Sequence, residues 1–375
     1  MAWRNKKKFR VVELYAGTGR SLEPFRRWRR AEKALLVDAD KFAASTYRRN
    51  FPTAPYAVGN LKTMPVADLI NLAKGSVDVL VGCPPCQGFS ESGKRDADDP
   101  RNYHITRFCT FALALRPLAI GMENVPLAAI SPEFGRMVRR IEAAGYCWTA
   151  GIANAALYGS GQSRQRLIFI AVRGDVGPAV LPTPTHGSND EYFDYSSQTF
   201  QSLSSAQVTI LGQTPALFRS IGKVPDDLTR PGSKRIPTIA QMLDGLPPLN
   251  SKRARRLSHV PFEHTREMLE IMSDVREGGR WDGGKDHFSH AYGRLHRRGL
   301  ARTVTTYFGN AGSGRFWHPT ENRALTVREA ARLQGFPDSF RFYSHEFVRN
   351  SRLVGNALDS ALAEMQYEAI RQVLE

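Results

Sequence analysis

Two of the four cysteines, Cys83 and Cys86, are separated only by two prolines in the stretch VGCPPCQGFSESGK. Such a pair can be a redox couple, half of a metal site, or one nucleophile beside a bystander. A four-cysteine zinc site needs a second close pair, but Cys109 and Cys147 are far apart. Residues that precede proline disfavour helix, which argues against a thioredoxin-like site. The single nucleophile remains, and it needs a cationic or dipolar neighbour because a free thiol is mostly protonated at neutral pH.

Candidate neighbours for that thiol occur further along the chain. Glu123 ends a strand-like segment in GMENVP, and Arg164 and Arg166 begin another in GQSRQRLIFIAV. Open α/β sheets bind ligands at the carboxyl ends of their parallel strands. A carboxyl group and two guanidinium groups are therefore expected at the rim where the cysteine loop begins.

A glycine turn lies at the end of the first strand-like segment, in VVELYAGTGR. Small residues at a strand-to-helix turn let a ligand approach the backbone. Asp38, about twenty residues later, ends the second strand-like segment, where a carboxylate can hold a ribose. Because Leu22 stands where a dinucleotide fingerprint has its third glycine, the pattern indicates a nucleoside-bearing cofactor other than NAD.

Six segments, in order along the chain, resemble the motifs of the cytosine-5 DNA methyltransferase family. They are ELYAGTG, GCPPCQGFS, MENV, QSRQR, LTVREAARLQGFPDSF and VGNA. The resemblance covers nearly the whole chain, and its Pro-Cys-Gln and Glu-Asn-Val parts are the most diagnostic. It implies transfer of a methyl group from S-adenosylmethionine to carbon 5 of a cytosine in duplex DNA.

The resemblance also implies a mechanism. Cys86 would add to carbon 6 of the ring, making carbon 5 nucleophilic. Glu123 would hold ring nitrogen 3 and the exocyclic amine, while Arg164 and Arg166 would contact the base carbonyl, orient the carboxyl or serve the phosphate. The base must leave the stacked duplex first. Cys83 would be the bystander.

The resemblance assigns further contacts by motif. Cofactor contacts fall on Tyr15, Ala16, Gly17, Thr18, Gly19, Asp38, Ala39, Asn60, Leu61, Asn356 and Ala357. DNA contacts are expected from a loop that closes over the flipped nucleotide and from a basic, Thr-rich stretch. They fall on Gln87, Ser90, Ser92, Lys94, Arg294, Arg297, Arg302, Thr303 and Thr305. Nine histidines without ligand spacing give no reason to expect a metal.

Four positions depart from the family pattern. Asn60 replaces the usual aspartate, Gly161 a common proline, and Arg20 a usual glycine. After Asn356 the chain reads Ala-Leu-Asp-Ser, where Val-Pro-Pro is frequent. These departures concern details of cofactor binding more than the reaction.

The elements that must position these residues follow a strand–helix alternation in the first half of the chain. RVVELYA, ALLVDAD, SVDVLVGC, PLAIGMENV, GYCWTAGIANA and RLIFIAVR predict strands. SLEPFRRWRR, with Ser21 as its N-cap, and KFAASTYRRN predict helices. This order predicts a mostly parallel sheet with helices on both faces, the Rossmann-like methyltransferase class.

Three regions are expected. Residues 1–178 form the catalytic and cofactor-binding domain, and residues 179–344 form a smaller, irregular target-recognition domain with a hinge. Residues 345–375 return to the catalytic domain. Late helices are predicted in TVREAARLQGF, capped by Thr326, and in NALDSALAEMQYEAIRQVLE.

Composition bounds the partners. The 52 Lys and Arg against 36 Asp and Glu give a formal charge of +16, which favours nucleic acid, although plain solubility explains it too. No stretch approaches the roughly 18 apolar residues of a membrane span, and the irregularly spaced cysteines do not predict disulfides. We expect a cytoplasmic, prokaryotic or phage-like monomer that is associated with the nucleoid and can have a cognate restriction endonuclease. A DNA-binding protein without activity and a transfer-RNA methylase on the same fold remain alternatives.

Overall fold

A seven-stranded sheet organises the first half of the chain in the computed structural model, which describes residues 3–85, 103–187, 232–283 and 291–375. Its strand order is β3-β2-β1-β4-β5-β8-β6. The strands span β1 Phe9–Leu14, β2 Ala31–Asp38, β3 Tyr56–Val58, β4 Val79–Gly82, β5 Ala119–Asn124, β6 Tyr146–Asn154 and β8 Gln165–Arg173.

The sheet is mostly parallel, as predicted, and β8 is the exception. The pairs β1–β2, β1–β4, β2–β3 and β4–β5 are parallel, whereas β8 runs antiparallel to both β5 and β6. Because β8 runs the opposite way, its first residues lie at the rim where the parallel strands end. Arg164 and Arg166 thereby reach the edge that carries Glu123.

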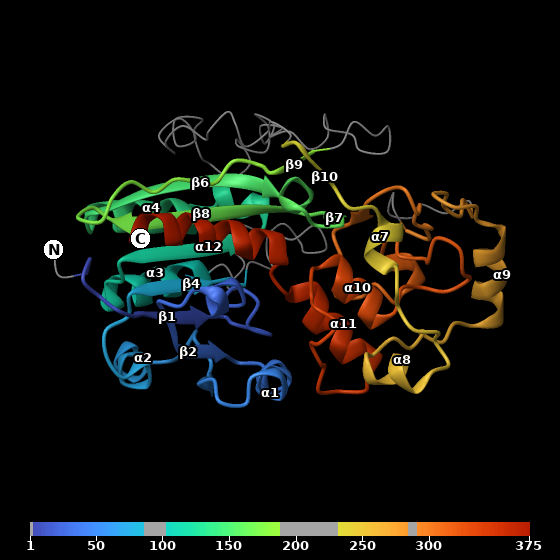
Figure 1. Ribbon diagram of the computed structural model, residues 1–375, viewed down its shortest axis with the longest axis horizontal. Coiled ribbons are helices and arrows are strands. Elements are labelled where there is room, and N and C mark those ends of the chain that lie inside the picture. The colour runs from blue at the N-terminus through green and yellow to red at the C-terminus, as the bar shows by residue number, and fades with distance from the viewer. Residues whose placement is uncertain (1–2, 86–102, 188–231, 284–290) are drawn as a thin grey trace.

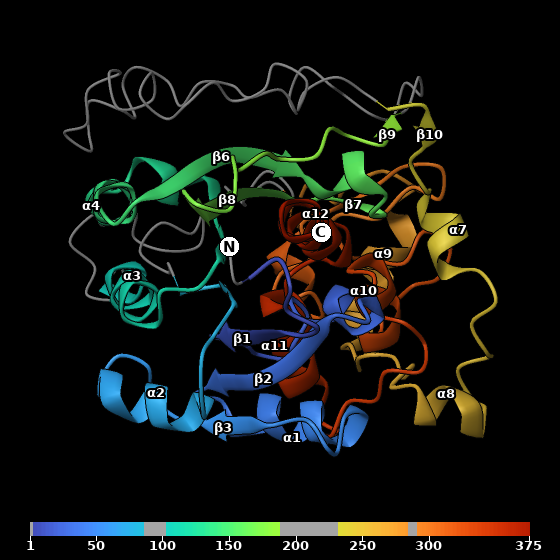
Figure 2. The same ribbon diagram turned by 60° about the vertical axis from the view of Figure 1, so that its left-hand side comes forward.

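Helices cover both faces of the sheet, as Figure 2 shows. One face packs against α2 Val66–Ala73, α3 Tyr103–Leu115 and α4 Pro132–Ala143 through a core that includes Phe108, Phe134 and Phe169. The other face packs against α1 Lys41–Asn50 and α12 Ser360–Leu374. Both faces of β1 are buried because Phe9 and Val11 face one core and Val12 and Leu14 the other.

The predicted helix over SLEPFRRWRR is wrong in extent. Only a 3-10 turn forms, at Pro24–Arg27, and its N-terminal flanking residue is Glu23. Ser21 is buried, and its backbone N–H donates to Glu13 Oε1 at 3.3 Å. The turn has no side-chain cap, and Ser21 Oγ lies instead 3.6 Å from Cys83 Sγ.

Beside the sheet lies a second group of short helices with its own core (Figure 1). It holds α7 Ile239–Leu243, α8 Lys252–Arg256, α9 Arg266–Asp274, α10 Val327–Leu333 and α11 Phe347–Asn356. Short strand pairs accompany them: β9 His186–Gly187 with β10 Lys234–Arg235, and β7 Gln162–Ser163 with β11 Ala301–Arg302. The predicted cap of α10 is confirmed, because Thr326 and Glu329 form a reciprocal capping box.

The chain returns to the sheet through α12. Helix α11 was expected to return with it, but its Leu353 and Val354 pack in the core of the second group. A break at Ala357–Asp359 separates the two helices, and the Asp359 side chain caps α12 by accepting from Ala361 N at 2.8 Å. In the described part of the chain, no helix has the length and apolar character to cross a bilayer.

Candidate functional site

Three neighbouring strands, β1, β2 and β3, present the predicted cofactor residues at their carboxyl ends. Tyr15 follows β1 with a positive φ of 56°, and Gly17 and Gly19 continue the turn with φ of 49° and 74°. Gly17 N donates to Asp38 Oδ2 at 2.8 Å, so the end of β2 fixes the turn that follows β1. A Cβ on Gly19 would lie 2.3 Å from the Tyr47 ring, whereas a Cβ on Gly17 would meet nothing within 4 Å. The space beside Gly19 is therefore filled by the Tyr47 ring, whereas the space beside Gly17 is free of atoms from the described part of the chain.

Asp38 sits half-buried at this rim. Its Oδ1 accepts from Asp40 N at 2.8 Å, and burial raises the pKa of the carboxyl. Asn60 follows β3 and is exposed, with Oδ1 accepting from Lys62 N at 3.0 Å. The hydroxyl of Tyr15 lies 3.2 Å from His104 Nδ1, which anchors the ring to α3.

Some of the remaining predicted cofactor residues are buried and others are exposed. Ala16, Thr18, Leu61 and Ala357 are buried, and Ala39 and Asn356 are exposed. Asn356 is the last residue of α11, so it lies next to the break that leads into α12.

The carboxyl of Glu123 pairs with Arg166 at the end of β5. Glu123 Oε1 lies 3.0 Å from Arg166 Nε, although within the described ranges that oxygen has no partner that meets hydrogen-bond geometry. Both side chains are largely buried, with 9% and 14% of their surface exposed. An ion pair in this setting is screened less than one at the surface, so it holds the carboxyl in place.

Asn124 ties the cysteine loop to this rim, a role that sequence reasoning missed. Its Nδ2 donates to Pro84 O at 3.1 Å, and its Oδ1 accepts from Val125 N at 2.9 Å. The conspicuous Glu-Asn-Val triplet was the available signal. Cys83 lies just before this anchor, with its Sγ 3.6 Å from Ser21 Oγ.

The predicted nucleophile and loop contacts lie outside the described residues. These are Cys86, Gln87, Ser90, Ser92 and Lys94. The residues just before them are described. Asn124 holds Pro84 through a hydrogen bond to its carbonyl. Burial, together with the nearby Glu123, raises the pKa of the Cys83 thiol well above its usual value. Cys83 is thereby kept as a neutral thiol.

Arg164 occupies a different position from Arg166. It is buried, and its guanidinium donates to Val304 O at 3.3 Å, Gly355 O at 3.2 Å and Ala357 O at 3.3 Å. Burial and the neighbouring Arg166 lower the pKa of Arg164 to about 9. The contacts found for Arg164 thus hold the second group of helices to the sheet.

Gln162 forms a second connection that sequence reasoning did not assign. Its Nε2 donates to Gln334 Oε1 and Asp359 Oδ2, each at 2.7 Å, and its Oε1 accepts from Val304 N at 3.0 Å. Ser160 Oγ also donates to Asp359 Oδ2, at 2.7 Å. This network fixes the break between α11 and α12 from the β7 side.

One predicted DNA contact needs correction. Arg294 is buried, and its guanidinium donates to the carbonyls of Val275, Met272, His318 and Glu321 and to Asn322 Oδ1. A guanidinium has five N–H donors, and these acceptors occupy them. Arg294 therefore holds loops of the second group together and does not reach DNA.

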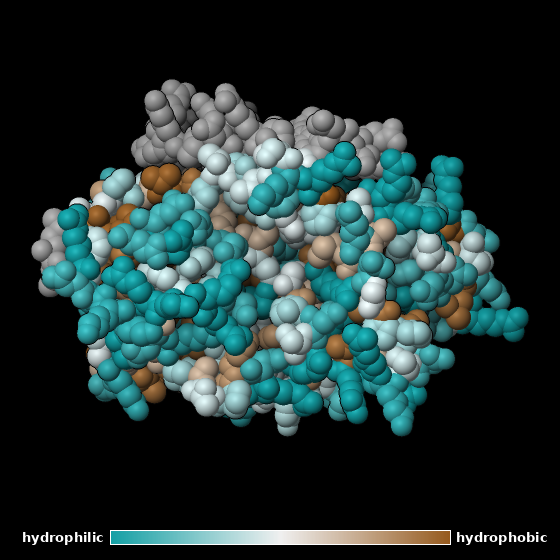
Figure 3. Space-filling view, in the orientation of Figure 1, coloured by the Kyte–Doolittle hydropathy of each residue, from teal (hydrophilic) through white to brown (hydrophobic). Residues whose placement is uncertain are grey.

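The other predicted DNA residues in the described ranges lie closer to the surface. Arg297 forms a bidentate pair with Glu277, at 2.9 Å for the shortest pair of atoms, and Arg302 is exposed. Thr303 Oγ1 donates to Ser163 O at 3.1 Å, and Thr305 Oγ1 accepts from Tyr307 N at 3.4 Å. On the face seen in Figure 3, hydrophilic side chains cover most of both parts of the molecule.

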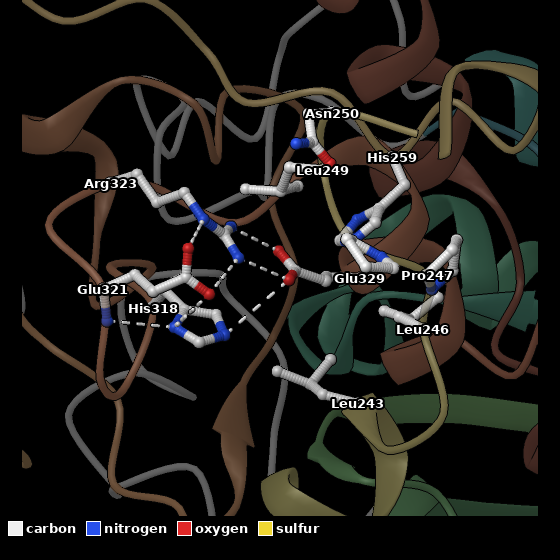
Figure 4. Close-up of a pocket in the computed structure, with 11 residues that line it drawn as sticks. Leu243, Leu246, Pro247, Leu249, Asn250, His259, His318, Glu321, Arg323 and Glu329 are labelled. Atoms are coloured by element: carbon white, nitrogen blue, oxygen red, sulfur yellow. Dashed lines mark hydrogen bonds and ion pairs between the residues drawn. The ribbon is translucent and has the colours of Figure 1, made fainter. Parts of the chain in front are cut away.

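A pocket of about 460 Å³ lies in the second group, away from the rim (Figure 4). Arg323 crosses it, pairing with Glu329 at 2.7 Å and with Glu321 at 2.9 Å. His318 also lies 3.7 Å from Glu321 and from Glu329, and none of the rim residues lines the pocket. Among the described residues, no three or more His, Cys, Asp or Glu side chains are grouped to hold a metal ion.

Comparison with known proteins matches the chain to one family. The family model for C-5 cytosine-specific DNA methylases matches residues 9–372. The chain is 29% identical over 380 residues to the Type II methyltransferase M1.HphI of Haemophilus parahaemolyticus, covering 96% of this chain and 86% of that protein. It is 25% identical to mouse DNA (cytosine-5)-methyltransferase 1, covering 95% of this chain and 28% of that protein.

Solved structures share the fold. A putative DNA modification methyltransferase encoded within an Escherichia coli prophage superposes with a TM-score of 0.69 at 20% identity, over 98% of this chain and 99% of that one. A Spodoptera frugiperda DNMT2 mutant gives 0.61 at 16% identity, over 98% of this chain and the whole of that one. At these identities the likeness supports the Rossmann-like architecture alone.

Proposed function

The chain belongs to the C-5 cytosine-specific DNA methylase family and is a DNA (cytosine-5-)-methyltransferase; from this we propose that it methylates a flipped-out cytosine in a specific duplex sequence through a covalent Cys86 adduct. The observation that carries the proposal is the Glu123–Arg166 pair, next to which Asn124 holds Pro84, two residues before Cys86 in the sequence. A nucleophile and a positioned acid at one rim are what addition to a pyrimidine ring requires.

The residues at the ends of β1 to β3 fit S-adenosylmethionine. The open space beside Gly17 admits a ligand close to the backbone, and the half-buried Asp38 can receive ribose hydroxyls. Tyr15 would face the adenine, and the exposed Asn60 amide would accept from its amine. When bound there, S-adenosylmethionine supplies an electrophilic methyl group.

The chain's own residues then prepare the base. The Cys86 thiolate adds to carbon 6 of the cytosine, which pushes electron density onto carbon 5. Glu123 holds ring nitrogen 3 and the exocyclic amine, and so stabilises the charge that develops on the ring. After methylation a base removes the carbon 5 proton, and the thiolate leaves as the double bond reforms.

Arg166 and Arg164 receive separate roles in this proposal. Arg166 touches Glu123, so it orients the acid and neutralises its surroundings. Arg164 donates to backbone carbonyls near the junction of α11 and α12 and is a positioning residue. Cys83 remains the bystander, because its raised pKa keeps it protonated.

Duplex DNA containing 5-fluorocytosine tests the proposal. Fluorine at carbon 5 cannot leave as a proton does, so incubation with S-adenosylmethionine should trap a covalent protein–DNA complex. Cys86→Ser should abolish that complex, and Cys83→Ser should retain it. Absence of an adduct on mixed genomic sequences, or an adduct that survives Cys86→Ser, would reject the mechanism.

The target and setting are also proposals. We infer a monomer acting in a prokaryotic cytoplasm, with a cognate restriction endonuclease, because the similar proteins M1.HphI and M.AgeI are named Type II methyltransferases. Bisulfite sequencing of DNA from an expressing host would give the methylated sequence. A labelled-methyl assay in which transfer RNA outcompetes duplex DNA would reject duplex DNA as the substrate.

A further inference from the structure

The residue after the glycine turn, Arg20, is a buried cation that reaches across the molecule. It is 4% exposed, and its Nη2 donates to Gly335 O at 3.1 Å and to Ser360 Oγ. Its guanidinium also stacks on Phe336, 4.5 Å from the ring centre. Gly335 is 315 positions further along the chain, so this contact joins the end of α10 and the start of α12 to the glycine turn.

Gly335 and Ser360 provide the acceptors for this guanidinium. Gly335 has a φ of 74°, which favours glycine, and a Cβ there would lie 2.5 Å from Ser360 Oγ. Ser360 Oγ in turn donates to Gly335 O at 2.7 Å while it accepts from Arg20. The hydroxyl thus uses both of its functions, and the three residues form a closed set of hydrogen bonds.

The Arg20 guanidinium is buried, and among the described residues its Nε and Nη1 have no hydrogen-bond partner. Burial lowers the pKa of the guanidinium, and the nearby acidic side chains of Glu23 and Asp359 oppose that effect. Removing one partner of such a buried set leaves the other charges uncompensated. Arg20 therefore depends on its contacts with Gly335 and Ser360.

Two of the departures from the family pattern meet at this point. Arg20 stands where a glycine is usual, and Ser360 stands in the segment where Val-Pro-Pro is frequent. A glycine offers no guanidinium and a proline no hydroxyl, so the hydrogen bond between Arg20 and Ser360 needs both changes. The structure thus places the two departures in one hydrogen-bonded pair.

We propose that Arg20 is a positioning residue that locks the cofactor turn, Tyr15–Gly19, to the junction of α10 and α12. The inference rests on the proposed function, since it assumes that this turn binds S-adenosylmethionine. The turn is already tied to β2 through Gly17 and Asp38, and Arg20 fixes its other end. Binding of the cofactor and placement of the second group of helices are thereby coupled.

Binding of S-adenosylmethionine to the full chain without DNA, measured by isothermal titration calorimetry, tests this coupling. Arg20→Met keeps volume and loses charge, and we expect its dissociation constant to rise about tenfold, within the usual range of coupling between sites. Arg20→Lys should recover part of the affinity, and Ser360→Ala should raise the constant by about threefold. The double variant should be no weaker than Arg20→Met, because the two residues act as one unit.

Steady-state kinetics separates positioning from general destabilisation. The KM for S-adenosylmethionine should rise in Arg20→Met while kcat at saturation and the KM for DNA stay within about threefold of wild type. Arg26→Met is the matched control, since Arg26 also stacks on a ring, that of Phe51 at 4.1 Å, but does not reach the junction.

Three outcomes decide the matter. Wild-type affinity in Arg20→Met, with only a lower melting temperature, would overturn the inference, as would effects of the two variants that simply add. If Arg20→Met does not fold, Ser360→Ala and Arg20→Lys carry the same comparison. No binding of S-adenosylmethionine by the wild-type chain would instead reject the proposed function.

Discussion

At the scale of single residues, the environment of Glu123 sets its role more than its type does. Carboxyl groups are common on this chain, but this one is buried against a guanidinium at the end of a parallel strand. A group held there in advance needs no reorganisation when charge develops on a substrate. Its contribution should therefore appear in kcat.

Glu123→Gln should lower kcat by about a hundredfold, because an amide keeps the shape but cannot donate a carboxyl proton to ring nitrogen 3. Affinity for S-adenosylmethionine should be unchanged, since Glu123 lies at the end of β5 and the proposed cofactor residues lie at the ends of β1, β2 and β3. Single-turnover methyl transfer and calorimetry measure the two quantities. Glu346→Gln, an exposed carboxyl outside the site, is the control. A loss of cofactor affinity equal to the loss of rate would contradict this role.

Glu13 gives the second prediction at this scale. The carboxyl is fully buried, and burial raises its pKa to about 8. Between the ordinary value near 4.5 and about 8, the folded chain holds a proton that the unfolded chain has lost, so stability should fall as pH rises through that window. The slope is at most about 1.4 kcal/mol per pH unit.

Melting temperatures at pH 5 and pH 8 check this. Glu13→Gln mimics the protonated carboxyl, so the decrease in melting temperature between the two pH values should be smaller than in the wild-type chain. Glu32→Gln, an exposed carboxyl on the neighbouring strand β2, should leave the decrease unchanged. Equal decreases in wild type and Glu13→Gln would show that the carboxyl is ionised throughout.

At the scale of elements, the reversal of β8 brings two arginines to the rim and gives them different tasks. Arg166 faces Glu123, while Arg164 turns toward Val304, Gly355 and Ala357. A strand alternates the direction of successive side chains, so residues two apart share a face only inside a regular strand. Arg164 precedes the first residue of β8, so its side chain need not point to the same face as that of Arg166.

Substitution of each arginine by methionine should separate the two tasks. Arg164→Met should lower the free energy of unfolding by about 3 kcal/mol, because three buried carbonyls lose a charged donor. Arg166→Met should lower kcat by about a hundredfold with a smaller effect on stability. Urea denaturation and methyl-transfer rates measure these effects. If Arg164→Met lost activity at unchanged stability, Arg164 would belong to the chemistry after all.

Local sequence patterns predicted the helices and strands, but they did not predict the side-chain contacts between segments that are far apart in the chain. The strands, α1 and the Thr326 cap follow from periodicity and capping chemistry, and the structure has them. The burial of Arg294 and the carbonyl contacts of Arg164 depend on segments far apart in the chain, which no local pattern records. Basic stretches predict affinity for polyanions but do not show which arginine faces inward.

At the scale of the whole molecule, two bodies are held together by polar contacts around the α11–α12 break. Gln162 and Arg164 reach this break from the sheet side, where they contact Asp359 and Ala357, and Arg20 contacts Ser360 at its far end. Buried polar networks specify one arrangement when every member is satisfied. These side chains help to fix the position of the second body, and apolar contacts add to them, because Ala43 and Phe51 pack against the core of the second group.

The charge of +16 predicts how this assembled surface meets DNA. Each phosphate neutralised by Lys or Arg releases a counterion, so the affinity for duplex DNA should fall steeply with salt. Arg302, the last residue of β11, is exposed, and Arg302→Ala should reduce the slope of log affinity against log salt by about 1. Arg294→Ala should instead lower the melting temperature, because the buried oxygens that Arg294 contacts lose their donor. Fluorescence anisotropy from 50 to 200 mM salt, with melting curves, distinguishes them. A slope unchanged by Arg302→Ala would place the DNA on another face of the molecule.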